Sequence, residues 1–158
     1  MRRTGILALA FVALAPSAVL AADVSVERGK QISTIGGCHD CHTVGYNESG
    51  GKIDPVTALK GSPVGFQGPW GTTYPMNLRI TAANKSEDEF VKFGKTFQTR
   101  PPMPWYNVHA MDEGDLRSLY QYIKSLGAPG DPAPDALPPG TEPKTPYIVF
   151  APPVMPKG

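Results

Sequence analysis

The segment Cys38-His39-Asp40-Cys41-His42 constrains this chain more than any other. Two thiols three positions apart, followed at once by a histidine, form the attachment pattern for a covalently bound haem. The cysteines add to the two vinyl groups of the porphyrin as thioethers, which carries His42 under the iron as an axial ligand. The chain has only these two cysteines, so this interpretation uses both. A chain of this kind builds its core around the haem.

The cysteine pair has three other interpretations. A thioredoxin-like redox pair needs a nearby βαβ pattern, and none surrounds this segment. A zinc site needs four ligands, and beyond Cys38, Cys41 and His42 only His39 and His109 could add a soft one. A disulfide between the two cysteines would not explain why His42 directly follows the second one. We therefore predict one covalently attached haem c, with His39 as a spacer.

Residues 1–22 have the composition of a secretory signal peptide. Arg2 and Arg3 precede an apolar stretch from Ile6 to Leu14, and small residues lie before Asp23. This stretch is short for a membrane span of about 20 residues, which disfavours the alternative of an uncleaved anchor. Because haem is attached to such cysteines after export, we expect a periplasmic protein in an oxidising compartment.

Charge excludes two classes of partner. Removal of residues 1–22 would leave a net charge of −1. This value is too near zero to indicate binding to nucleic acid or to an anionic membrane surface. We expect no stable membrane insertion after cleavage, and the remaining chain fits a single domain by its length.

Hydrophobic periodicity predicts three main helices and an all-α fold. The first covers residues 24–36 and ends at two glycines. The second opens at Ser86, where Glu89 completes a capping box, and runs to about Phe97. The third runs from about Asp112 to Leu126 with an amphipathic apolar stripe. Between residues 43 and 83 glycine and proline break every pattern, so we expect a long loop packed on the haem.

Residues 128–158 form a proline-rich tail. They contain ten of the 18 prolines of the chain, a composition that favours an extended, polyproline-like segment without a core of its own. Residues 147–150 are an apolar exception. They dock on the folded domain, dock on a partner or remain disordered, and the sequence leaves these three alternatives open.

A six-coordinate haem needs a second axial ligand. The chain offers five candidates, namely Met76, Met103, Met111, Met155 and His109. Met103 is favoured because prolines on both sides stiffen the backbone that would present its thioether to the iron. Met76, which follows a proline inside the long loop, is the second choice.

The order of these parts resembles the class I cytochrome c family. Four segments more narrowly resemble single-haem modules in the cytochrome subunits of periplasmic alcohol, aldehyde and sugar dehydrogenases; they are Glu27-Arg28-Gly29, Cys38 to Thr43, Gly71 to Leu78 and Pro102-Met103-Pro104-Trp105. The resemblance covers about residues 24–127 and implies a cytochrome c domain over residues 23–127, with three helices and long loops around one haem. It also implies that Met103 and not Met76 is the distal ligand. Gly29 would let the first helix cross the last against an aromatic side chain, for which we choose Tyr120.

We therefore expect a periplasmic monohaem cytochrome c that carries single electrons and is not itself an enzyme. Cys38, Cys41, His42 and Met103 would bind the haem, with His42 and Met103 on the iron. The donor would be a periplasmic dehydrogenase and the acceptor a cytochrome or terminal oxidase. The alternatives are a dedicated haem subunit of a dehydrogenase complex and a small haem enzyme or gas sensor. Candidate hydrogen-bond partners for the haem propionates or for the iron ligands are Trp70, Tyr74, Asn77, Arg79 and Arg100.

Overall fold

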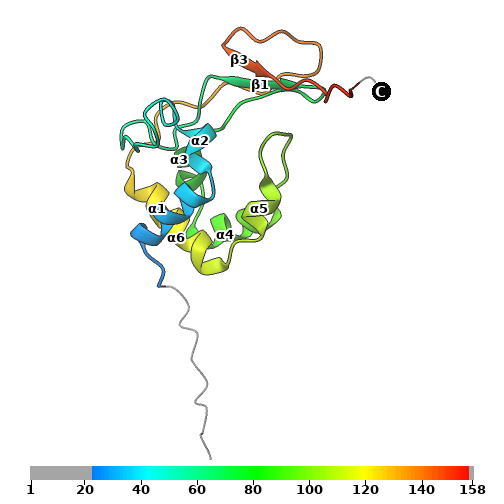
Figure 1. Cartoon of the computed structure of the whole chain (residues 1–158). Helices are drawn as coiled ribbons and strands as arrows, with labels where there is room; N and C mark the ends of the chain where they lie inside the picture. Colours follow the sequence, from blue (N-terminus) through cyan, green and yellow to red (C-terminus); the bar gives the residue numbers. More distant parts are fainter. Residues whose placement is uncertain (1–22, 157–158) are drawn as a thin grey trace, which may run out of the picture.

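The computed structural model describes residues 23–156 as six helices and a three-stranded sheet (Figure 1). The expected signal peptide, residues 1–22, lies outside the described residues. The helices are α1 (Val26–Ile35), α2 (Cys38–His42), α3 (Leu78–Ala83), α4 (Glu87–Thr96), α5 (Trp105–His109) and α6 (Glu113–Ser125). The strands are β1 (Gly65–Gly68), β2 (Gly71–Thr73) and β3 (Tyr147–Val149). The fold is thus mostly helical, and the expectation of an all-α class is corrected by the small sheet.

The three expected helices correspond to α1, α4 and α6. The capping box at α4 is confirmed: Ser86 Oγ accepts a hydrogen bond from the Glu89 N–H, and the Glu89 carboxylate accepts one from the Ser86 N–H. The apolar faces of α4 and α6 meet in one buried core, together with the loop residue Leu59. The remaining members of this core are Ala82, Phe90, Leu119, Tyr122 and Ile123. Burial of side chains of this size contributes about 1.5–3 kcal/mol each.

The crossing of α1 over α6 depends on Gly29. A Cβ at this residue would lie 1.9 Å from the Ser118 carbonyl oxygen and 2.7 Å from Tyr122 Cβ. The aromatic partner is therefore Tyr122, and the choice of Tyr120 was wrong. Ser118 and Tyr122 are four residues apart and share one helix face, whereas Tyr120 points toward α4, with its ring centroid 5.5 Å from that of Phe90.

The segment from 43 to 83 is not the structureless loop that the sequence predicted. It contains the β1–β2 hairpin, paired antiparallel from Phe66 with Thr73 to Gly68 with Gly71, and the short helix α3. Asn77 caps α3, since its Oδ1 accepts hydrogen bonds from two backbone N–H groups at the helix start. The six residues of α3 and the four of β1 are too few for periodicity to reveal them.

The proline-rich tail returns to the domain. β3 pairs in parallel with β1, in the register Gly65 with Tyr147, and completes a sheet of order β2-β1-β3 (Figure 1). Docking on the folded domain is thus the alternative that holds for residues 147–150 in this structure. Between residues 23 and 156, no helix is both long enough and apolar enough to span a bilayer.

Candidate functional site

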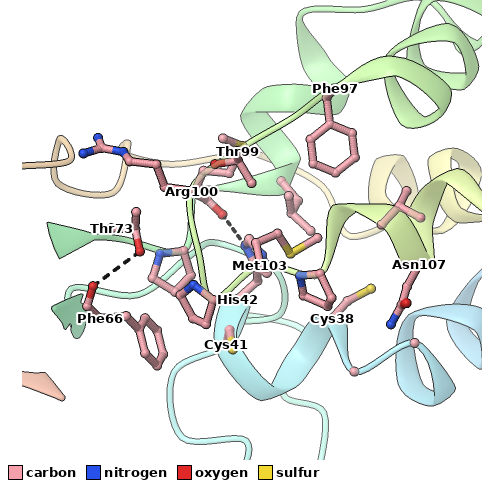
Figure 2. A pocket seen from close by; sticks show the side chains of 18 of the residues that line it. Cys38, Cys41, His42, Phe66, Thr73, Phe97, Thr99, Arg100, Met103 and Asn107 are labelled. Carbon is pink, nitrogen blue, oxygen red and sulfur yellow. Dashed lines mark hydrogen bonds between the residues drawn. The ribbon is translucent and has the colours of Figure 1, made fainter. Parts of the chain in front are cut away.

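A pocket with a cavity volume of about 280 Å³ lies among α2, the β1–β2 hairpin and the loop between α4 and α5 (Figure 2). Its volume is near the lower end of the range for cofactor and ligand sites, about 300–1,000 Å³. Cys38, Cys41, His42 and Met103 all line it. Most of its other walls are apolar, and these include Phe66, Leu78, Phe93, Phe97, Val108 and Met111.

Three of the expected haem-binding residues are brought together by the five-residue helix α2. The chain turns sharply from α1 into α2 at Gly37, which has a φ of 68° in the left-handed region that glycine tolerates. Within one helical turn, residues three and four apart share a face. Cys41 and His42 therefore lie on the same side as Cys38, and all three line the pocket (Figure 2).

Both cysteines are free thiols in the structure. Burial raises the pKa of Cys38 to about 11 and also raises the pKa of Cys41. A redox-active C-x-x-C pair instead carries a thiol with a lowered pKa, which supplies the nucleophilic thiolate. The environment of Cys38 and Cys41 thus disfavours the thioredoxin-like interpretation on physical grounds.

The protonation of His42 is determined by a contact with the segment before α3. Its Nδ1–H donates a hydrogen bond to the Met76 carbonyl oxygen at 2.7 Å. This bond leaves Nε2 without a proton and able to bind a metal. The side chain is 6% exposed, and burial lowers its pKa, which favours the neutral ring that a metal requires.

His39 is not the spacer that the sequence suggested. It is fully buried, and its Nδ1 lies 2.8 Å from Thr43 Oγ1 while its Nε2 lies 3.1 Å from Ser33 Oγ. Ser33 uses its hydroxyl proton to bond the Lys30 carbonyl, so it accepts from His39 Nε2–H. Thr43 then donates to Nδ1 and also accepts the Leu59 N–H at 2.9 Å.

The two histidines of one motif therefore carry opposite tautomers. Burial lowers the pKa of His39 to about 4 and keeps its ring neutral. His39 joins α1, α2 and the loop around Leu59, while His42 presents its bare nitrogen to the pocket. No local pattern could have revealed the role of His39, because its partners Ser33, Thr43 and Tyr122 come from α1, the end of α2 and α6.

The candidates for the distal ligand differ in their placement. Met103 lines the pocket from the loop between α4 and α5 (Figure 2). Met76 also lines it, but its carbonyl binds His42 Nδ1, the nitrogen remote from the metal-binding Nε2. Its side chain is 48% exposed, with Sδ 3.6 Å from Thr81 Oγ1. Met76 thus belongs to the side of the pocket that holds His42 in place.

The three remaining candidates for the distal ligand are His109, Met155 and Met111. His109 Nε2–H donates to the Phe97 carbonyl at 2.8 Å, and its ring packs on Trp105. Met155 is exposed in the tail. Met111 lines the pocket beside Gly36, where a Cβ would lie 3.3 Å from Met111 Cε.

Only some of the suggested propionate partners lie at the pocket. Tyr74 and Arg100 line the pocket, whereas Trp70, Asn77 and Arg79 do not. Arg79 is 4% exposed and donates only to backbone carbonyls, those of Pro55, Ala58, Leu126 and Ala128. It therefore ties the loop before β1 to the end of α6, a role for which the sequence carried no signal.

The residues of the pocket suit a covalently bound haem by the chemistry of their donors. Two free thiols share one helix face, an imidazole has a bare Nε2, and a thioether is available from another segment. A family model described as Cytochrome c matches residues 26–127. This range includes every residue that lines the pocket and ends before the proline-rich tail. No curated protein and no solved structure gives a significant match.

Proposed function

Since this chain belongs to the cytochrome c family, matched over residues 26–127, we propose that it carries single electrons through one covalently bound haem. The observation that carries the proposal is the neutral His42, whose Nε2 is bare because Nδ1–H is bound to the Met76 carbonyl. It lines the same pocket as two free thiols at attachment spacing. The bound haem supplies an iron that alternates between the ferric and ferrous states.

Each site residue has a distinct task in this proposal. The thiols of Cys38 and Cys41 would each add across one vinyl group to form a carbon–sulfur bond, so that the haem stays attached independently of the ligands of its iron. His42 would supply a nitrogen ligand to the iron, and the Met76 carbonyl orients its ring. Met103 would supply a thioether ligand to the iron, and a thioether stabilises the reduced state more than a second imidazole does. The apolar walls exclude water from the pocket.

We place the protein in the periplasm, because haem attachment to such a motif follows export and residues 1–22 have the composition of an export signal. Its donor would be a periplasmic dehydrogenase and its acceptor a cytochrome or a terminal oxidase. The protein would then be an electron carrier and not an enzyme. The alternative is a dedicated haem subunit whose tail becomes ordered only when it binds a dehydrogenase. It has less support, because β3 of the tail already pairs with β1.

The test is to replace Met103 by alanine, with Met76→Ala as the matched control. Both side chains line the pocket, so both variants remove a thioether from its wall. We expect Met103→Ala to abolish the sulfur-to-iron absorption of the oxidised protein, to lower its reduction potential and to permit carbon monoxide to bind the reduced form. Met76→Ala should retain the wild-type spectrum. The opposite pattern would transfer the distal role to Met76, and a protein without any haem spectrum would refute the proposal.

A further inference from the structure

The tail beyond the family-matched residues is attached beside the histidine that we assign to the iron. Asn77 Nδ2 donates hydrogen bonds to the carbonyls of Pro129, at 2.7 Å, and Asp131, at 2.9 Å. Asn77 directly follows Met76, whose carbonyl holds His42. Both amide hydrogens of Asn77 are therefore used to attach the tail at this point.

Another attachment of the tail lies at Leu137 and reaches the segment that carries Met103. The backbones of Leu137 and Thr72 exchange two hydrogen bonds, at 2.8 and 3.0 Å. The Leu137 carbonyl also accepts a bond from Arg100 Nη1 at 3.2 Å. A Cβ at Gly71 would lie 2.2 Å from this carbonyl, so the close approach of the tail requires a residue without a side chain.

The loop between α4 and α5 has few other attachments. Among the described residues, the hydrogen bonds of residues 98–102 run only to the β1–β2 hairpin and to the tail. Thr73 Oγ1 donates to the Pro101 carbonyl at 2.7 Å, and Arg100 Nη1 donates to the Trp70 carbonyl at 3.1 Å and to Leu137. The position of this loop thus depends on the hairpin and on the tail that covers it.

The C-terminal part of the tail packs against the β1–β2 hairpin. Tyr74, which lines the pocket, has its hydroxyl 2.9 Å from Thr145 Oγ1. The Phe150 ring lies 6.0 Å from that of Phe66 and 5.9 Å from that of Trp70. Figure 1 shows the tail running along the sheet, with the loop before α5 rising toward it. The tail therefore touches both the hairpin wall of the pocket and the loop that bears Met103.

We propose that residues 129–150 form a strap that positions Met103, so that its thioether resists displacement from the iron while the strap is paired and yields when it is released. This inference rests on the proposed function, because it takes Met103 as the distal ligand. The strap lies beyond the family match, which ends at residue 127. Its release would convert an electron carrier into a haem protein with an accessible iron position.

The strand β3 offers a matched pair of substitutions for the test. Gly65 N–H donates to the Pro146 carbonyl and Phe150 N–H donates to the Gln67 carbonyl. Because alternate residues of a parallel strand face the same neighbour, Ile148 presents its N–H to β1 while Val149 presents its own to the open edge. Ile148→Pro therefore removes a hydrogen bond of the ladder, and Val149→Pro removes none. Both side chains are exposed, at 51% and 61%.

The measurement is the rate at which carbon monoxide binds the reduced haem protein, together with the rate of amide exchange at Phe150. We expect Ile148→Pro to bind carbon monoxide about tenfold faster than Val149→Pro, with faster exchange at Phe150, because loss of a ladder bond favours local opening. Val149→Pro should match the wild type. Equal binding rates in the two variants would overturn the inference, as would unaltered exchange at Phe150 in Ile148→Pro.

A second pair of variants tests the strap if Ile148→Pro does not accumulate as a haem protein. Thr145→Val removes the hydroxyl that reaches Tyr74, whereas Thr145→Ser keeps it. Faster binding in the valine variant alone supports the strap, and equal rates refute it. The wild type separates this inference from the proposed function. Rapid carbon monoxide binding by the wild type would contradict ligation by Met103 itself, whereas a resistant wild type with equally resistant variants would contradict only the strap.

Discussion

Replacing Gly29 by alanine is expected to destabilise the protein by forcing α1 away from α6. The new Cβ would lie 1.9 Å from the Ser118 carbonyl oxygen, where ordinary contact begins near 3.4 Å, so a gap of about 1.5 Å has to open. The obstacle is backbone and cannot rotate aside. Ile32 and Tyr122, each only 4% exposed, would lose part of their packing as the helices separate.

The magnitude follows from two opposed effects. Overpacking of a close interface costs about 1–3 kcal/mol, and a backbone obstacle places this site at the upper end. Alanine in place of a helical glycine returns about 1 kcal/mol. We therefore expect a net loss of about 2 kcal/mol in the free energy of unfolding.

Gly94→Ala is the matched control, because Gly94 is also a buried glycine within a helix. There the new Cβ would meet Leu116 Cδ2 at 2.9 Å, the end of a side chain that can turn by a few tenths of an ångström. The same gain in helix propensity should leave this variant within about 0.5 kcal/mol of the wild type. Urea unfolding followed by circular dichroism measures both. Equal stability of the two variants would refute the argument that the α1–α6 crossing depends on Gly29.

Two further predictions concern the network around His39. Its pKa of about 4 in the folded state lies below the ordinary value of 6.5, so the unfolded chain binds a proton that the folded protein excludes. The contribution of His39 to the free energy of unfolding is then fully present above about pH 6.5 and falls as the pH is lowered toward 4. His39→Gln should flatten the pH dependence of this free energy, measured by unfolding at a series of pH values. An unchanged dependence would exclude His39 as its source. Thr43→Val leaves the Leu59 N–H without its acceptor and should cost about 2 kcal/mol, whereas Thr43→Ser keeps the hydroxyl and should cost much less. Thermal unfolding compares the two, and equal losses would show that the methyl group of Thr43 matters more than its hydrogen bonds.

Features that depend on neighbours along the chain could be predicted without the structure. Such features are the haem-attachment motif, the capping box at Ser86 and the apolar stripe of α6. In each of them the interacting residues are three or four positions apart, which is the spacing of neighbours on a helical turn. The same local reasoning brought Met103 forward among five candidates. It failed for α3 and the β1–β2 hairpin, whose lengths are below those at which periodicity can be read.

The contacts between segments that are distant in the chain could not be predicted from local patterns. The tautomer of His42 depends on a carbonyl 34 positions away, and the burial of His39 depends on groups from α1 and the following loop. Likewise, the proline-rich tail is extended by composition, but its pairing with β1 joins Gly65 to Tyr147. Such contacts arise because unpaired backbone groups and apolar faces must find partners once the core has formed, and a one-dimensional pattern does not say which partners lie within reach.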